Sequence, residues 1–255
     1  MPLSHRLLRP IASRSLVDAD ATAYLSAVQT ADGQALEPAV RDAITAFVIG
    51  CKLDGIWNAI RLSCILIGAR TLAGALTPLR GGAVTNNNFV SGDYNRKTGL
   101  VGNGTNKSLS QAIPTGSYLN DHSFSVFHSS LAGSAAAWAC GDSSVWYGFF
   151  ASTPGQPNFR SSNNQLTHSQ NRAAGLIGAS RNVSTEFICR NNQANETKVQ
   201  NSAVPLSSGS WIVWGSGSPP TSDRNVFYHF GQSINLALLD SRVTALSNAI
   251  GAAIP

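Results

Sequence analysis

The feature that most constrains the fold is a change of hydrophobic periodicity along the chain. Residues 64–230 contain short apolar or alternating runs, separated by clusters of glycine, asparagine, serine and proline. Such runs predict β-strands joined by turns, and many short strands without intervening helices are typical of an antiparallel sandwich. In residues 18–63 and 231–255, apolar side chains instead recur at helical spacing. We therefore expect a mainly β fold with helices at both ends.

The helical segment 18–63 carries clear start and stop signals. Asp18 or Asp20 can cap its first helix, Gly33 can end it, and Pro38 suits the first turn of the second helix. Apolar residues of the second helix recur at steps of three and four: Val40, Ala43, Ile44, Phe47, Val48 and Cys51. A helical hairpin this small cannot bury such a stripe alone, so it must lie against the rest of the chain or against another subunit.

Two shorter segments flank this hairpin. Asp54 is expected to cap a third, short helix that carries Ile56, Trp57 and Ile60. Residues 1–17 form an arm with three arginines, in which a proline interrupts any helix. The arm is either a frayed terminus or a segment that docks on a partner, and its apolar residues are Leu7, Leu8, Ile11, Leu16 and Val17.

The C-terminal segment 231–255 predicts a helix with a heptad seam. The seam consists of Leu236, Leu239, Val243, Leu246, Ile250 and Ala253. It spans fewer than three heptads, so the helix can pack on its own chain or form a bundle between subunits. We expect a homo-oligomer whose interface consists of Leu236, Leu239, Val243, Leu246 and Ile250 together with Val40, Ile44 and Phe47. The Val/Ile and Leu alternation by itself favours a dimer.

Composition and charge limit the partners and the compartment. Charged residues make up 12% of the chain, and the net charge of +5 reflects 13 acids more than 18 scattered bases. We therefore expect no nucleic-acid partner, and no apolar run is long enough to cross a membrane. Since the start lacks the apolar core of a signal peptide, we expect synthesis in a reducing cytoplasm. The cysteines are then free thiols: Cys51, Cys64, Cys140 and Cys189.

The sandwich region lacks recognisable catalytic or metal-binding motifs. Glycosidases need two closely placed carboxylates, and no strand carries such a pair. There is no nucleophile elbow, and the five histidines lack metal-ligand spacing. Asp93 with Asn95, and Asn120 with Asp121, could contribute to a calcium site, although such residues more commonly close turns. We therefore expect a protein that is not an enzyme and has no catalytic residues, cofactor or metal.

Several segments resemble a known family. Residues 88–94 (NFVSGDY) and 99–107 (GLVGNGTNK) resemble the first strands of the concanavalin A/laminin-G-like domains found in bacteriophage virion proteins. Residues 227–231 (FYHFG) and 238–246 (LLDSRVTAL) resemble the last strand and terminal helix of the same proteins. The helices around residues 52–57 fit the segment that usually precedes the domain. The resemblance extends over nearly the whole chain from the first predicted helix onward.

This resemblance implies a fold and a role. The fold is a concanavalin A-like jelly-roll sandwich, and the role is that of a structural component of the tail, fibre or capsid surface of a virion. Its partners are then other virion proteins, and the fibre-like relatives imply a trimer. The alternative is a lectin-like module that recognises a host surface glycan.

Overall fold

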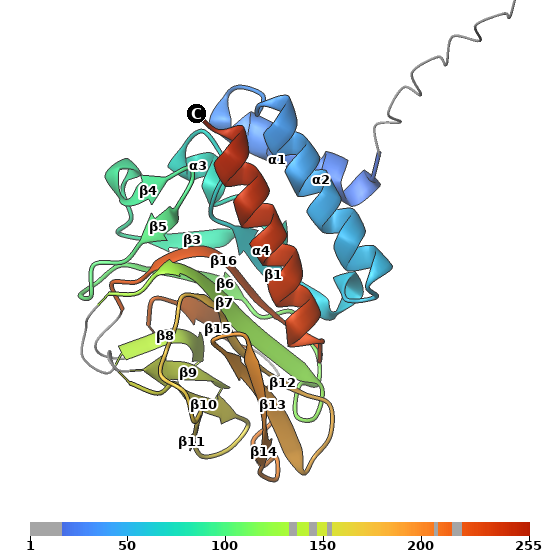
Figure 1. Ribbon diagram of the computed structural model, residues 1–255, viewed down its shortest axis with the longest axis vertical. Helices are drawn as coiled ribbons and strands as arrows, with labels where there is room; N and C mark the ends of the chain where they lie inside the picture. Colours follow the sequence, from blue (N-terminus) through green and yellow to red (C-terminus); the bar gives the residue numbers. More distant parts are fainter. Residues whose placement is uncertain (1–16, 133–136, 143–146, 152–154, 207–208, 216–220) are drawn as a thin grey trace, which may run out of the picture.

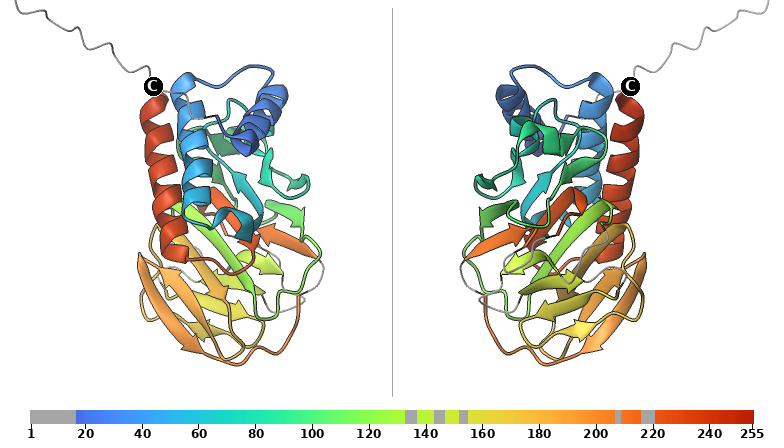
Figure 2. Two further views of the ribbon diagram at one scale, coloured as in Figure 1. Left: turned by 90° about the vertical axis from the view of Figure 1, so that its right-hand side faces the viewer. Right: turned by 90° about the vertical axis from the view of Figure 1, so that its left-hand side faces the viewer.

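In the computed structural model, two antiparallel sheets pack face to face, and helices cover the outer side of one sheet (Figures 1 and 2). The expected fold class, a mainly β antiparallel sandwich with N-terminal helices and a C-terminal helix, is confirmed. The structure describes residues 17–132, 137–142, 147–151, 155–206, 209–215 and 221–255, with only the backbone described for 137–142 and 151.

The larger sheet, sheet A, has the strand order β14-β13-β12-β7-β16-β1-β2, and β5 joins it by pairing with both β16 and β4. Strand β1 from the N-terminal part thus lies beside β16 from the C-terminal part, and this pairing closes the fold. The strands of sheet A are β1 (Ile60–Ile65), β2 (Pro78–Arg80), β4 (Tyr94–Asn95), β5 (Gly99–Val101), β7 (His122–Ser130), β12 (Gly175–Arg181), β13 (Glu186–Asn191), β14 (Ala194–Val199) and β16 (Arg224–Gly231).

The smaller sheet, sheet B, has the order β11-β10-β9-β8-β15-β6-β3. All of its described pairings are antiparallel. Its strands are β3 (Val84–Asn87), β6 (Ser108–Ala112), β8 (Ala137–Asp142), β9 (Tyr147–Ala151), β10 (Asn158–Ser161), β11 (Leu166–Thr167) and β15 (Ser210–Val213).

The helices gather at one end of the molecule, while the hairpin β13–β14 lies at the other end (Figure 2). The helical elements are α1 (Ala19–Asp32), α2 (Pro38–Leu53), α3 (Leu72–Ala75) and α4 (Leu236–Ala253), with short 3-10 turns η1 (Trp57–Ala59) and η2 (Ser91–Asp93). Within the described residues, none of these helices combines the length and the apolar character needed to cross a membrane.

The predicted capping signals of α1 and α2 are confirmed, whereas Asp54, predicted to cap the third helix, is instead the C-cap of α2, and η1 has no side-chain cap. The Asp18 carboxylate accepts hydrogen bonds from the backbone amides of Asp20 and Ala21 (3.0 and 3.1 Å), which satisfies donors that the first turn of α1 cannot pair. Gly33 follows α1 with a φ of 71°, a left-handed conformation that glycine adopts readily. Pro38 opens α2.

The prediction of a third helix within segment 18–63 is wrong beyond the first turn of that helix. Only η1 is helical, and β1 begins at Ile60, so the sandwich starts four residues before the predicted boundary at residue 64. From Ile60 to Cys64, apolar residues alternate with Arg61 and Ser63, which fits a strand, but Ile56, Trp57 and Ile60 also fit the spacing of a helix. At the other end, α4 begins at Leu236, five residues after the predicted start at residue 231.

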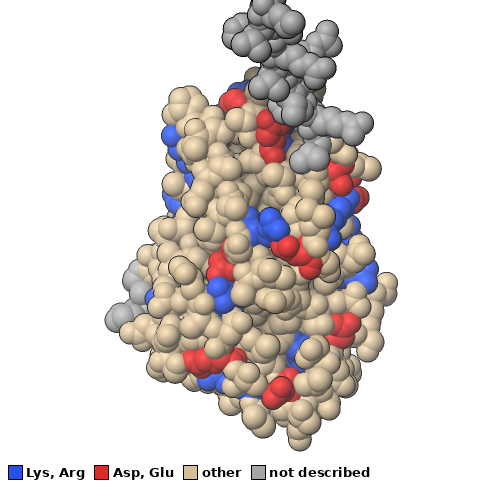
Figure 3. Space-filling model, turned by 45° about the vertical axis from the view of Figure 1, so that its right-hand side comes forward, with Lys and Arg blue, Asp and Glu red and all other residues tan. Residues whose placement is uncertain are grey.

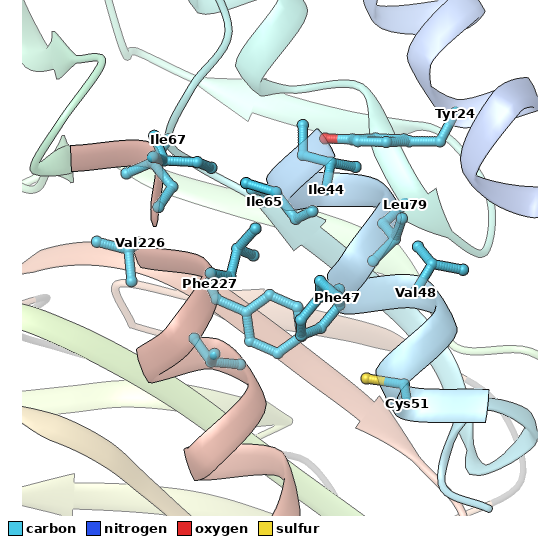
Figure 4. Close-up of a cluster of buried hydrophobic side chains, with 14 of the residues drawn as sticks. Tyr24, Ile44, Phe47, Val48, Cys51, Ile65, Ile67, Leu79, Val226 and Phe227 are labelled. Atoms are coloured by element: carbon cyan, nitrogen blue, oxygen red, sulfur yellow. The ribbon is translucent and has the colours of Figure 1, made fainter. Parts of the chain in front are cut away.

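Alternation along the strands separates two hydrophobic cores. On β7, Phe124 and Val126 point between the sheets, while Phe127 points toward the helices. The core between sheet A and the helices includes Phe47 of α2, whose ring meets that of Phe227 edge to face at 5.8 Å (Figure 4). Sheet A is therefore a middle layer, with sheet B on one side and the helices on the other.

Leu246 lies on the inner face of α4 and is 3% exposed, whereas Leu238 on the same helix is 37% exposed. Replacing a buried leucine by alanine removes apolar contacts and leaves a cavity. We expect Leu246→Ala to lower the free energy of unfolding by about 2–5 kcal/mol in urea titrations.

The matched control, Leu238→Ala, should lower the free energy of unfolding by less than about 1 kcal/mol. Equal losses for the two variants would contradict the placement of α4.

Candidate functional site

The side chains that the sequence assigns to an interface are buried within a single chain. They are Leu236, Leu239, Val243, Leu246 and Ile250 on α4, and Val40, Ile44 and Phe47 on α2. Each of them is at most 3% exposed, because α4 packs on α2 and both helices cover sheet A. The prediction that these side chains form an interface is therefore wrong, since the spacing defines a buried stripe but not its partner. The homo-oligomer itself stays a prediction.

Ion pairs and a close helix approach fasten α4 to its own chain. Arg242 donates two hydrogen bonds to the Asp54 carboxylate, at 2.7 and 2.8 Å. Arg190 of β13 donates to Asp240 of α4 at 2.9 Å, and both side chains are buried. A Cβ atom on Gly50 of α2 would lie 2.7 Å from the Arg242 guanidinium, so a larger residue there would displace the Arg242 side chain. The helical layer is thus an integral part of the body.

The outer side of this layer carries a groove of about 450 Å³ between α1 and α2, which we call the outer groove. Leu25 and Leu36 supply its apolar surface, while Arg41 and Asp42 on α2 are exposed and, among the described residues, have no ion-pair partner. Val17 stands at its edge with 83% of its surface exposed. The remaining lining residues are Thr22, Ser26, Gln29, Thr30, Pro38 and Thr45. The exposed lining of the groove is mainly polar, because Leu36 is buried and Leu25 is half-buried, and a polar, solvent-accessible surface of this kind is found at the rim of protein interfaces.

Charged side chains elsewhere are mostly paired. Figure 3 shows lysine and arginine on this face in small groups, several of them beside aspartate or glutamate, without a continuous basic surface. Glu37, for example, binds both Arg96 (2.7 Å) and Arg70 (3.2 Å), and Lys52 binds both Asp18 (2.7 Å) and a neighbouring aspartate.

The two candidate calcium clusters are engaged in other contacts. Asp93 pairs with Lys107, and Asn95 accepts hydrogen bonds from two backbone amides of its own turn at 2.9 and 3.0 Å. Asn120 accepts a hydrogen bond from a serine hydroxyl at 2.5 Å. Asp121 accepts a hydrogen bond at 2.8 Å from a backbone amide in the loop that leads to α4. The oxygen atoms of these residues therefore hold loops, which is the common role of such residues.

His229 is buried in a hydrogen-bond network on the helix side of sheet A. The Ser123 hydroxyl donates to the Gln232 carbonyl (2.5 Å), so it must accept its other bond from His229 Nε2 (2.9 Å). His229 Nδ1 then carries a lone pair and accepts from the Ser125 hydroxyl at 2.6 Å. This serine–histidine contact lies under α4 with 0% exposure, so it organises the core.

His122 and His128 point between the sheets from the same face of β7, as their even spacing predicts. His122 Nδ1 donates to the Tyr118 carbonyl (2.6 Å), and its Nε2 accepts from the Ser161 hydroxyl (2.7 Å). His128 lies 3.8 Å from the buried Asp223 carboxylate. Both imidazoles are fully buried, so neither faces a substrate.

The cysteine prediction is confirmed for Cys51, Cys64 and Cys189, which are free and buried. Burial raises the pKa of the Cys51 thiol to about 12, despite the opposing effect of the Arg242 guanidinium. The Cys140 side chain lies outside the described residues. These buried thiols are unreactive at neutral pH unless a metal ion binds them.

The structure also brings together three side chains that the sequence analysis did not connect. His168 follows β11, Cys189 lies on β13 and Glu196 lies on β14, and their ligand-type atoms are all within 4.8 Å of one another. A two-residue turn at Asn192 and Gln193, both with positive φ, pairs Cys189 with Glu196 across the hairpin. That pairing could have been predicted from the turn, whereas His168 comes from the other sheet and no sequence spacing reveals it.

Burial strongly lowers the pKa values of three histidines: His122 and His229 to about 3, and His128 to about 4, against an ordinary 6.5. Below pH 6.5 the unfolded chain therefore binds protons that the folded chain excludes, so stability present above pH 6.5 is lost as the pH falls toward 4. Each histidine should lower the free energy of unfolding by about 1 kcal/mol for every pH unit in this window. We expect the urea midpoint to fall steeply from pH 6.5 to pH 5.

His229→Asn should reduce the slope of the free energy of unfolding against pH by the contribution of one proton, because one of the three buried imidazoles is removed. The pH slope decides the test, since the substitution itself can lower stability at every pH. Identical midpoints at pH 7.5 and pH 5 for the wild-type chain would contradict the assignment of neutral buried imidazoles.

No protein-family model and no curated protein matches the chain. Solved structures with a similar arrangement include domain 4 of AbnA, a GH43 extracellular arabinanase from Geobacillus stearothermophilus in complex with arabinotriose (13% identity, TM-score 0.40, covering 66% of this chain and 82% of that chain). A second is the binding domain of botulinum neurotoxin DC in complex with SialylT (9% identity, TM-score 0.48, covering 76% of this chain and 51% of that chain). A third is Trypanosoma rangeli sialidase in complex with 2,3-difluorosialic acid (13% identity, TM-score 0.41, covering 83% of this chain and 40% of that chain). The chain thus spans about half of the neurotoxin domain and two fifths of the sialidase. At these scores the likenesses carry no argument about function, and the fold class stands on the strand topology.

Proposed function

We propose that the chain is a non-enzymatic structural protein of a bacteriophage virion, attached to other virion proteins through the outer groove. The groove is the observation that carries the proposal, because the inner faces of α2 and α4 are already buried within the chain. Any partner of the helical layer must therefore contact its outer side. The helices lie at one end and the sandwich extends away from them, as an attached surface protein requires (Figure 2).

The segments that resemble virion proteins also support the proposal. Residues 99–107 include β5, which pairs with β16, and residues 227–231 end β16 just before α4. Residues 100 and 101 pair with Arg224 and Asn225 at the start of β16, and residues 227–231 form its end. Both segments therefore belong to sheet A, next to or within the strand that leads into α4.

Ser26 lines the outer groove, whereas its neighbour Ala27 is equally exposed on α1 but does not line it. We expect Ser26→Trp to fill the groove and lower incorporation into phage particles about tenfold or more, which corresponds to a loss of about 1.4 kcal/mol of binding free energy. Incorporation is measured as the fraction of the chain that cosediments with particles released from the producing cells.

Ala27→Trp is the matched control and should be incorporated like the wild type. Both variants should show the circular dichroism spectrum and melting temperature of the wild type. A wild-type chain that stays entirely in the particle-free fraction would refute the virion role, and equal incorporation of the two tryptophan variants would refute attachment through the groove.

Recognition of a surface glycan by sheet B is the second candidate function. Phe150, Asn158 and Thr167 are consecutive register partners on β9, β10 and β11, on the face opposite to the buried Phe149 and Phe159. An aromatic ring beside an amide and a hydroxyl combines the apolar and polar contacts that a sugar ring requires. The Phe150 ring lies 5.8 Å from the Arg160 guanidinium, which adds a cation to this row.

A glycan array separates the two functions. If the sandwich is a receptor module, the wild-type chain should bind a defined set of glycans, Phe150→Ala should lose that binding, and Ile212→Ala on β15 of the same sheet should keep it. An array without signal for the wild type would remove the glycan candidate and leave the structural role unchanged.

A further inference from the structure

The cluster of His168, Cys189 and Glu196 lies at the edge where the two sheets meet. Sheet A contributes Cys189 and Glu196 from its last two strands, and sheet B contributes His168 from the loop after its last strand. His168 and Cys189 are fully buried, and the Glu196 side chain is 21% exposed, so the cluster has one side toward solvent. These are three different ligand types rather than a group of surface acids.

The position of each side chain is fixed by backbone contacts. The His168 amide donates to the Pro157 carbonyl at 2.9 Å, which holds the loop against β10. The Asn191 side chain donates to the Gln170 and Asn171 carbonyls at 3.1 and 3.0 Å, which ties the same loop to the end of β13. The three side chains are therefore held near one another by the fold, and no large rearrangement is needed to bring them together.

The hydrogen bonds also assign the proton on the imidazole. The Gln170 amide donates to His168 Nδ1 at 3.1 Å, so Nδ1 carries a lone pair and the proton sits on Nε2. Nδ1 lies 3.4 Å from Glu196 Oε1, while the buried Nε2 has no hydrogen-bond partner among the residues that the structure describes. Glu196 Oε1 also accepts hydrogen bonds from the Ser169 amide (2.9 Å) and the Ser169 hydroxyl, while Lys198 holds the other oxygen, Oε2, at 2.6 Å. The lone pair of Nδ1 and Oε1 therefore lie close together beside the Cys189 sulfur.

We propose that His168 Nδ1, Cys189 Sγ and Glu196 Oε1 bind a divalent transition-metal ion, with zinc as the ion that this set fits best. Nitrogen, sulfur and oxygen ligands together are characteristic of zinc. Tetrahedral bonds of about 2.0–2.3 Å place ligand atoms about 3.3–3.8 Å apart. Nδ1 and Oε1 are 3.4 Å apart, so they already meet this requirement. The Cys189 sulfur lies within 4.8 Å of each of them, so it must move by about 1 Å at most to reach a tetrahedral distance. Water completes the fourth position from the solvent side.

Binding converts the Cys189 thiol to a thiolate. The S–H bond breaks, a sulfur–metal bond forms and the proton leaves to solvent, so no redox change is involved. The Gln170 amide gives up its contact with Nδ1 as the nitrogen–metal bond forms. The thiolate and the Glu196 carboxylate together neutralise the ion, and Lys198 remains on the second carboxylate oxygen. The bound ion joins the edges of the two sheets and acts as a structural clamp.

The test uses the full, untagged chain after treatment with a chelator and dialysis. Titration with Co²⁺ should give a thiolate-to-cobalt charge-transfer absorption that saturates at one ion per chain, and Zn²⁺ should abolish it by displacement. Saturating Zn²⁺ should also raise the melting temperature by about 5 °C, because the ion binds only the folded chain.

Matched variants separate this site from other thiols. Cys189→Ser should abolish the charge-transfer band, and Glu196→Gln should weaken Zn²⁺ binding about tenfold or more. Cys51→Ser, which removes an equally buried thiol in the helical layer, should leave both the band and the stoichiometry unchanged. A wild-type chain without the band, or a band that survives in folded Cys189→Ser, would overturn the proposal.

Discussion

The central strands β1 and β16 of sheet A are buried on both faces, and the rest of the structure depends on this constraint. Neighbouring strands β1 and β16 send Leu62 and Phe230 into the core between the sheets, and Ile65 and Phe227 into the core under the helices. Antiparallel sheets commonly leave one face to water, so a sheet of this kind needs a second cover. The helices supply that cover from both ends of the chain. A sandwich fragment without them would expose a large apolar surface, so the helices and the sandwich form one folding unit.

Buried polar groups then set the register between the layers. The Arg181 side chain is fully buried and has no carboxylate partner within the described part of the chain, and its guanidinium donates to Ser161 and to backbone carbonyls, including that of Gln200 (3.0 Å). Arg190 binds Asp240 across the boundary between sheet A and α4. Such groups are costly unless every bond is made, so they favour one arrangement of the layers over shifted alternatives.

The sequence predicted the fold class, the limits of α1 and the stripes on α2 and α4, because these follow from local periodicity and capping. It did not predict β1, although Arg61 and Ser63 alternate with apolar residues there, because Ile56, Trp57 and Ile60 also fit helical spacing. It also assigned the stripe through Leu239 and Val243 to a partner subunit, because spacing is the same whether a helix packs on its own sheet or on another chain. The outer groove and the cluster around His168 depend on the tertiary arrangement, which no local pattern contains.

The two ends of the molecule are held together by different forces. At the helical end, sheet A is covered by large apolar side chains such as Phe47 and Phe227. At the opposite end, β10 and β11 are short, and the inward residues of β14 are mostly polar or charged, so apolar burial there is small. The contacts of Glu196 with Ser169 and His168 replace it as the link between the sheet edges. A metal ion at this place would strengthen the join where the hydrophobic cores contribute least.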